Sequence, residues 1–410
     1  MLISSLDFDK PERAGAMLDM TPLSCKYITN EVISKNQHYF SDGNLNAIPL
    51  LNILYEHLKT YYPKEQDSVN FEDIFHTLEM WNSVLTSKNE QAIKPFRSIL
   101  GMLCDIKKEY DCVNGTLIYS GMNDLVNSVI ENVAKYETDV HKQENSWFSS
   151  FFRDLQKQHL LDIFTLNYDT WMEQILEDFN DGFIPYMDTH QKFSPNYLFE
   201  NSMHLSTINH LHGQICFTSH LPNGSMRLLT DGWYKANSYD IIASLKIYPK
   251  HPSFMQQTQA AEQLFQYPII TGMRKTDKVT LPPFDAYLHH LYQKLLSNNK
   301  LLIIGYGFGD LYINSLIKQF RDFHGKEGKV TCINFLNPNE WVYNFSEMPL
   351  STNMKQCIYR LFDDSDLPHR FLGSNFLSYI DTLNQKSRLY LCGFKTTVVN
   401  YRDDIYEFFA

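Results

Sequence analysis

The most constraining feature of this sequence is the apolar run at residues 300–304 (Lys-Leu-Leu-Ile-Ile), which ends in the glycine-rich turn 305–310. A strand that is apolar on both faces is typical of a parallel sheet covered by helices on both sides. After the turn, apolar residues recur at helical spacing: Ile313, Leu316, Ile317 and Phe320. A second apolar run follows at 330–335. Strand, turn, helix and strand in this order make a βαβ unit, so we predict an α/β fold with a Rossmann-like, doubly wound parallel sheet.

The middle of the chain carries further strand and helix signals. Residues 161–165 (Leu-Asp-Ile-Phe-Thr) are short and apolar, which predicts a strand. Apolar residues at helical spacing predict a helix behind it: Met172, Ile175, Leu176 and Phe179. Residues 208–217 alternate in polarity, and Asn223-Gly224 favours a tight hairpin turn. We therefore expect residues 226–229 to pair back on that segment.

The domain organisation follows from where these patterns change. At about residues 40–160, apolar side chains recur every three or four positions, which predicts a large helical insertion. We expect residues 1–340 to form one domain that contains this insertion. Residues 341–410 are mixed and aromatic, and we expect a C-terminal extension of unknown role. Two helices are expected in it, near residues 371–384 and 402–409.

Charge and hydropathy exclude several classes of protein. Lys plus Arg number 36 and Asp plus Glu 47, a net charge of −11, which argues against direct binding to a nucleic-acid backbone. Residues 1–40 show no clear opening strand, and four acidic residues within the first 20 do not fit a secretory signal. No apolar run reaches the roughly 18 residues of a membrane helix. We expect a cytoplasmic protein that binds no membrane.

The seven cysteines are scattered, and none forms a Cys-x-x-Cys pair. A closed zinc site needs ligands brought together, usually by that short spacing. We therefore expect no zinc and no other metal site, and reduced, buried thiols instead.

Polar side chains stand where two of the expected strands end. Thr165, Asn167 and Asp169 follow the strand at 161–165, and ligands in open α/β sheets bind at that edge. Asn and Asp are also good helix caps, so capping of the next helix is the simpler interpretation of each one alone. The turn at 305–310 lets a backbone approach phosphate, although tight strand-to-helix packing also explains such glycines. Its spacing is not the Gly-x-Gly-x-x-Gly of dehydrogenases.

A third motif is His210-Leu211-His212-Gly213. On a strand the two histidines point to one face. A structural histidine is the simpler interpretation, and two histidines without two further ligands do not make a zinc site. Gly213 permits an abrupt turn and a close backbone approach, which suits a histidine at a cleft.

In combination and order, these motifs resemble the sirtuin family. Thr-x-Asn-x-Asp, a Leu-His-Gly about 45 residues later, and an apolar strand ending in a glycine turn occur in the same sequence. The similarity is greatest to the prokaryotic sirtuin-like proteins of anti-phage defence, some of which hydrolyse NAD. Three further stretches resemble that group: residues 70–74, residues 268–272 with Lys275, and residues 304–310.

The resemblance implies a role for each matching residue. Asn167 would hold the nicotinamide ribose and the attacking water, Asp169 would order the site or contact the nicotinamide amide, and His212 would be the base. Residues expected to border the NAD molecule are Thr165, Gly305, Gly307, Asp310, Asn334 and Gly15. Because the sirtuin deacylases place a four-cysteine zinc module between Leu-His-Gly and the glycine strand, and only Cys216 lies there, protein deacylation is not expected.

One departure concerns the phosphate loop. Gly15-Ala16-Met17-Leu18-Asp19 stands where the family has Gly-Ala-Gly-x-Ser. Met17 would block the close approach and Asp19 would repel phosphate. The resemblance therefore implies either an NAD glycohydrolase (NADase), active in abortive infection as a homo-oligomer or with a partner from the same operon, or an inactive NAD- or nucleotide-binding sensor subunit.

Overall fold

The computed structural model describes the following residues: 2–3, 51, 54–55, 58, 71–86, 115–202, 204–219, 232–245, 254–257, 263–272, 275–337, 347–362, 380–381 and 386–410. Gly15 and its neighbours, the turn at 223–224 and the segment 226–229 lie outside this part, so those predictions remain untested.

Two groups of parallel strands form the centre of the molecule. One has the order β1 (Leu2–Ile3), β11 (Lys300–Ile304), β12 (Lys329–Ile333) and β14 (Ser387–Tyr390), with β13 (Ile380–Asp381) antiparallel at its edge. The other has the order β2 (Asp162–Thr165), β6 (Ser206–His210) and β3 (Phe179–Asn180). Because β1 lies beside β2, the groups are neighbours. The predicted Rossmann-like α/β fold is confirmed.

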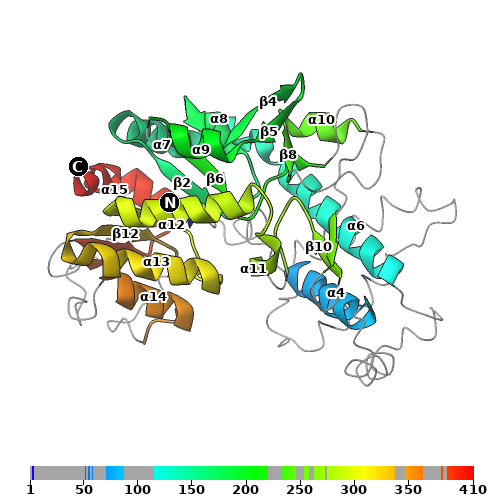
Figure 1. Ribbon diagram of the computed structural model, residues 1–410. Coiled ribbons are helices and arrows are strands. Elements are labelled where there is room, and N and C mark those ends of the chain that lie inside the picture. The colour runs from blue at the N-terminus through cyan, green and yellow to red at the C-terminus, as the bar shows by residue number, and fades with distance from the viewer. Residues whose placement is uncertain are drawn as a thin grey trace.

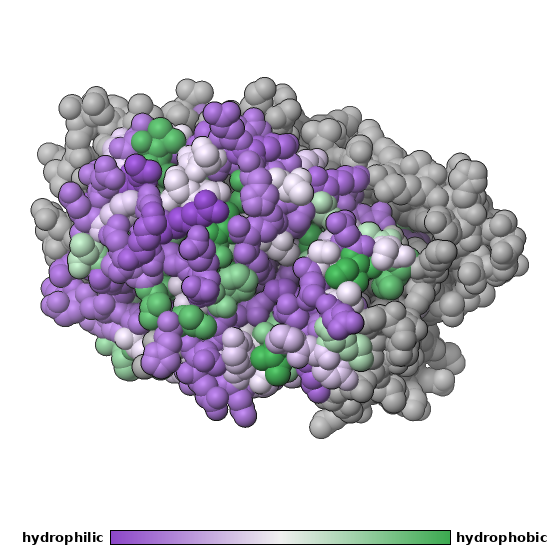
Figure 2. Space-filling model, turned by 90° about the horizontal axis from the view of Figure 1, so that it is seen from above, coloured by the Kyte–Doolittle hydropathy of each residue, from purple (hydrophilic) through white to green (hydrophobic). Residues whose placement is uncertain are grey.

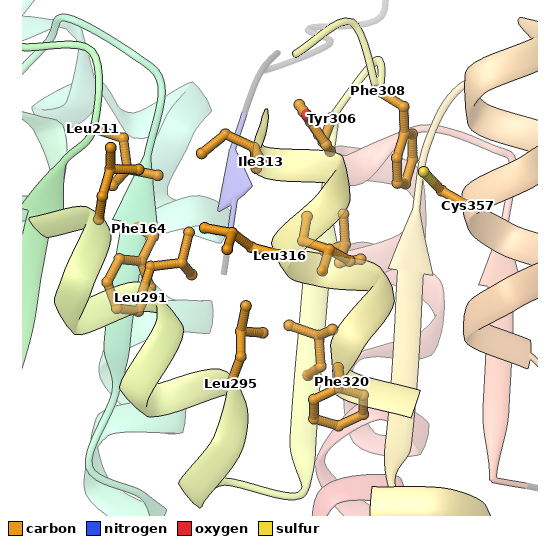
Figure 3. Close-up of a cluster of buried hydrophobic side chains, with 14 of the residues drawn as sticks. Phe164, Leu211, Leu291, Leu295, Tyr306, Phe308, Ile313, Leu316, Phe320 and Cys357 are labelled. Atoms are coloured by element: carbon orange, nitrogen blue, oxygen red, sulfur yellow. The ribbon is translucent and has the colours of Figure 1, made fainter. Parts of the chain in front are cut away.

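Helices cover both faces of these strands. On one face lie α12 (Phe284–Ser297), α13 (Leu311–His324) and α14 (Thr352–Phe362), of which α12 and α13 run side by side in Figure 1. Their core takes in Phe164, Ile303 and Cys332. Figure 3 shows Phe164 in this cluster near Leu291 of α12. On the other face α7 (Ser146–Gln158) and α15 (Phe394–Phe409) pack on Ile304 and Ile333. Consecutive strand residues thus enter opposite layers, which explains why residues 300–304 are almost entirely apolar.

Local sequence fixes the ends of the helix that follows the glycine turn. The Asp310 carboxylate accepts hydrogen bonds from the backbone N–H groups of Tyr312 and Ile313, so it caps α13 at its first turn. Gly325 ends the helix with a φ of +54°, a conformation that glycine adopts at no steric cost.

Residues 341–410 contribute to the same sheet. β14 pairs with β12 along four residues, and α15 packs against α7. The predicted helix near 402–409 is confirmed as the end of α15. The helix predicted at 371–384 is wrong at residues 380–381, which form β13, because pairing with β14 determines their conformation.

A helical group lies beside the sheet in Figure 1. It contains α4 (Phe71–Thr86) and α6 (Gly115–Ala134), which pack together and against β10 (Gln263–Gln266), itself paired with β9 (Phe254–Gln257). Its core includes Ile215 and Ile269, so the group reaches the segments that flank Gly213. The described parts of residues 40–160 are thus mostly helical, as expected.

A small antiparallel sheet packs near the end of β6. Its order is β4 (Phe183–Met187), β5 (His190–Phe193), β8 (Tyr234–Ala236) and β7 (Phe217–Thr218). The remaining short helices are η2 (Glu137–His141), η3 (Gln143–Asn145), α8 (Trp171–Ile175), α9 (Pro195–Asn201), α10 (Tyr239–Ala243), α11 (Lys275–Lys278) and η5 (Gly325–Glu327).

Two further sequence predictions are wrong. The helix expected from Met172 to Phe179 ends at Ile175, and Phe179 begins β3, because its edge pairing with β6 overrides the helical spacing. The chain does have an opening strand: Leu2–Ile3 pairs parallel with Ile303 and Ile304. Two residues are too few for a pattern, so only the neighbouring strand reveals them.

The hydropathy of the surface matches the charged composition of the chain. Figure 2 shows a face that is mostly hydrophilic, with hydrophobic side chains in small groups. Among the described residues, no helix combines the length and apolarity needed to cross a bilayer.

Candidate active site

The predicted site residues other than Gly15 lie at or just beyond the carboxyl ends of β2, β6, β11 and β12. Because these strands are parallel, the loops that follow them emerge at one edge of the sheet. Two backbone hydrogen bonds hold the first two loops together: Leu211 N–H donates to Thr165 O, and Ile215 N–H donates to Tyr168 O.

The loop after β2 is fixed through its own side chains. Thr165 is buried, and its hydroxyl oxygen accepts the backbone N–H of Asn167 at 3.0 Å. The Tyr168 hydroxyl donates to Ile270 O. The Asn167 side chain is largely buried, and its amide makes no hydrogen bond within the described residues. This amide is therefore available to a ligand.

Asp169 combines a structural role with an unsatisfied oxygen. Its Oδ1 accepts the N–H of Trp171, the first residue of α8, although the N-cap position of that helix is Thr170 and not Asp169. Its Oδ2 is buried and finds no hydrogen-bond partner in the described part of the chain. Burial raises the pKa of Asp169 to about 6, and burial followed by the charge of Asp169 raises the pKa of Glu137 to about 7.

His212 stands at a backbone turn that only glycine can complete. Gly213 has a φ of +86°, and a Cβ at this position would lie 1.9 Å from Pro268 O. Ile270 N–H donates to His212 O at 2.7 Å, and Gly213 forms an antiparallel bridge with Ile269. The segment at 268–271, which resembles part of the sirtuin-like family, thus holds His212 in place.

His212 pairs with Asp310 from the loop after β11. Its Nε2 lies 3.2 Å from Asp310 Oδ2, and both side chains are nearly buried, at 10% and 13% exposure. Burial lowers the pKa of His212, although Asp310 raises it. Burial raises the pKa of Asp310, but the hydrogen bond and charge of His212, the N–H of Ile313 and the charge of Lys275 together lower it below its usual value. Since Asp310 occupies Nε2, the Nδ1 atom is the ring nitrogen left to act on a substrate.

The glycine turn alternates between buried aromatics and exposed glycines. Tyr306 and Phe308 point into the core, where Figure 3 shows Phe308 beside Cys357. Gly307 and Gly309 are exposed, and a Cβ at either position would meet no atom within 4 Å. Open space therefore lies over the turn, immediately before Asp310.

The glycine turn is held by three side chains. The Tyr306 hydroxyl donates to the Asn314 side-chain oxygen at 2.8 Å, and Asn314 Nδ2 donates to Phe308 O. Asn334 Nδ2 donates to Tyr306 O at 3.1 Å, so this residue, expected to border the NAD molecule, supports the turn from the end of β12. Gly305 has a φ of +55°, and its N–H donates to Ile333 O.

Some of the predicted site residues are in direct hydrogen-bond contact. His212 and Asp310 touch, as do Thr165 and Asn167. The Asn167 amide and the His212 ring are not hydrogen-bonded to each other.

Sequence reasoning missed Glu137 and Glu173 because carboxylates on short helical segments look like solvated surface charges. The pairing of Asp310 with His212 was also missed. The position of Asp310 directly before the helix at 311 indicates a helix cap and gives no sign of a contact with a histidine.

Comparison with known proteins supports the resemblance. Residues 162–340, less than half of the chain, match the family described as SIR2-like domain. No curated protein matches the chain. The matched segment runs from β2 to just beyond β12 and contains each predicted site residue except Gly15. This part of the chain is therefore similar to a family whose domains are generally enzymes that use NAD. Among the described residues, no group of three or more His, Cys, Asp or Glu side chains could hold a metal ion.

Proposed function

We propose that the protein is an NAD glycohydrolase, which cleaves the bond between nicotinamide and ribose to give nicotinamide and ADP-ribose. The observation that carries this proposal is the buried His212–Asp310 pair, which stands at the carboxyl edge of the sheet beside the exposed Gly307 and Gly309. A ligand that lies over the glycine turn would reach the histidine, as ligands do at this edge of α/β sheets.

The residue types fit the chemistry of the reaction. Breaking the C1′–N bond gives the ribose oxocarbenium character, and nicotinamide leaves as a neutral base. A water then adds at C1′ and loses a proton, which the neutral Nδ1 of His212 can accept. Asp310 would hold the ring in the required tautomer. The Asn167 amide would hold the ribose and the water, since positioning supplies much of the rate in such reactions.

Asp169 would order the nicotinamide half. Its Oδ2 has no partner within the described residues, and its pKa of about 6 allows a population of the protonated acid at neutral pH. A protonated carboxyl can donate a hydrogen bond to the carboxamide oxygen of nicotinamide, and a carboxylate can accept one from its NH₂ group.

A catalytically inactive NAD-binding sensor is the second candidate function. The replacement of the second loop glycine by Met17, together with Asp19, favours it, because both changes weaken a phosphate cradle. The intact pair of His212 and Asp310 favours the enzyme, because a pure binding protein needs no oriented base.

Cleavage of NAD beside two variants tests the proposal. Released nicotinamide is measured for the wild type, His212→Ala and Asn167→Ala, with circular dichroism to verify folding and calorimetry to measure NAD binding. We expect both variants to bind NAD and to lose about 10²- to 10⁴-fold in rate. Binding by the wild type without nicotinamide release would instead support the sensor.

Regulation and setting are part of the same proposal. A constantly active NADase would deplete its own cell, so we propose a regulated effector of anti-phage defence in the cytoplasm, working by abortive infection. Assembly as a homo-oligomer, or with a partner encoded in the same operon, would supply the control. Mixing the purified protein with candidate operon partners and finding neither complex nor change in rate would contradict this.

A further inference from the structure

A second histidine lies directly behind the Asn167 loop. His210 is 1% exposed, at the end of β6. Its Nδ1 lies 3.2 Å from Asn167 O, and its Nε2 lies 2.9 Å from Glu173 Oε1. A carbonyl and a carboxylate only accept hydrogen bonds, so both ring nitrogens must donate. The geometry therefore requires the doubly protonated, positively charged ring.

The surroundings balance that charge. Glu173 Oε1 also accepts from Gln214 Nε2 at 3.1 Å, and Lys235 Nζ lies 3.7 Å away and pairs with Asp181 on its other side. Two cations and two carboxylates thus form a neutral buried group. Burial lowers the pKa of His210, but Glu173 outweighs it and the net change is upward. Burial alone would raise the pKa of Glu173, yet His210 and Lys235 hold it at about 2.

Two further carboxyls face the same region from the amino end of α8. Beside burial, which is the largest cause for both, the charge of His210 lowers and that of Glu173 raises the pKa of Asp169. The charges of Asp169 and Glu173 raise the pKa of Glu137. Both have raised pKa values, about 6 and about 7, so they are partly neutral near pH 7. Glu173 is therefore the permanent counter-charge of His210.

The Glu173–His210 pair connects the two elements that flank the Asn167 loop. Glu173 belongs to α8, which directly follows the loop, and His210 belongs to β6, which runs beside β2. The pair therefore joins the element after the loop to the strand beside it, and His210 holds the Asn167 carbonyl. Thr165 holds the N–H of the same residue. With both backbone groups of Asn167 fixed, only its side chain remains free to meet a ligand.

We infer that the Glu173–His210 pair is the device that positions Asn167 for cleavage of the nicotinamide–ribose bond, an inference that rests on the function proposed above. His210 is a positioning residue because it is buried and both its nitrogens are occupied, whereas His212 keeps Nδ1 free. The two histidines of one motif thus have different protonation states and different tasks.

Glu173→Gln is the most informative variant. The new carboxamide places its oxygen at the Oε1 position, because the donors Gln214 Nε2 and Lys235 Nζ also face that atom. The oxygen still accepts from His210 Nε2, but the negative charge that retains the second ring proton is gone. The neutral ring then turns the Nδ1 lone pair toward Asn167 O, and the loop is released. We expect kcat to fall about 10- to 100-fold, because small displacements of a positioning group cost that much. KM should stay within about threefold.

Three further variants complete the test. His210→Gln should lower kcat similarly, and the double variant should be no worse than the worse single one, because two parts of one device do not add. His204→Gln, at an exposed histidine before β6, is the matched control and should leave kcat unchanged. If Glu173→Gln keeps kcat within twofold of the wild type, or the double variant shows the full product of the single losses, the inference is wrong.

A readout without turnover separates this inference from the proposed function. Nitrogen NMR of the imidazole should show both ring nitrogens of His210 protonated at pH 7 in the wild type and one in Glu173→Gln. Amide hydrogen exchange at residues 166–169 should be faster in Glu173→Gln than in the wild type and in the control His204→Gln. If the wild type cleaves no NAD, the proposed function is wrong. These two measurements would still show whether the Glu173–His210 pair positions Asn167. A neutral His210 in the wild type, or unchanged exchange in the variant, would overturn it.

Discussion

Replacing Asp310 by asparagine should abolish most activity while leaving the helix cap intact. In the wild type, Oδ1 accepts the N–H groups of Tyr312 and Ile313 at 3.0 and 3.1 Å, and Oδ2 faces His212 Nε2 at 3.2 Å. The asparagine oxygen must take over the cap, since the amide NH₂ cannot accept. The NH₂ group then donates to Nε2, which moves the ring proton to Nδ1, the nitrogen needed as base.

The expected magnitudes follow from these contacts. Asn caps a helix about as well as Asp, so the loss of charge at the helix start costs only about 0.3–1 kcal/mol in unfolding free energy. Loss of a general base costs about 10²- to 10⁴-fold in kcat, or about 3–5 kcal/mol in activation free energy. Asp310→Ala should behave oppositely, because it removes the cap at a cost of about 0.5–2 kcal/mol but leaves His212 free to adopt the active tautomer.

Nicotinamide release and urea unfolding measured on both variants test this reasoning. We expect the asparagine variant to be the more stable and the less active, and the alanine variant to be the less stable and the more active. An asparagine variant that keeps more activity than the alanine variant, or that stays within threefold of the wild type, would show that the tautomer of His212 does not control cleavage.

Two other predictions follow. Burial lowers the pKa of His212, and the base must be neutral, so kcat/KM should fall as the pH drops through that pKa. The midpoint of this fall should lie below 6.5, and the fall should be absent in His212→Ala. A midpoint above 6.5 would contradict the assignment of His212 as the base. Gly213→Ala should lower the unfolding free energy by more than about 2 kcal/mol, because its Cβ would lie 1.9 Å from Pro268 O at a φ of +86°. Gly309→Ala, whose Cβ meets open space, is the control, and equal denaturation midpoints for the two variants would refute the steric argument.

The sequence predicts the βαβ unit well because its signals are local. Residues 300–304 are apolar on both faces, and the helix after them has its cap, its spacing and its terminating Gly325 within a few positions. The same reasoning fails at β1 and at Phe179. Both are strands only because a neighbour distant in sequence offers its edge, and no short pattern contains that information.

The candidate site is predictable as a place but not as a set of contacts. That Asn167 and His212 follow parallel strands is enough to put them at one sheet edge. That Asp310 meets His212, 98 positions earlier in the chain, depends on how β6 and β11 are arranged across the sheet. Nothing in the motif itself distinguishes the two histidines, because their protonation states depend on Glu173 from α8 and on Asp310 from the turn after β11.

The position of β14 has a consequence for biosynthesis. During translation the strands β11 and β12 leave the ribosome long before residues 387–410, which supply both the neighbour of β12 and the helix that covers Ile304 and Ile333. A nascent chain therefore carries an unpaired strand edge and an uncovered apolar layer until residues 387–410 have left the ribosome. We therefore expect the sheet, and with it the proposed cleavage of NAD, to be complete only once residues 387–410 are available to pair and pack.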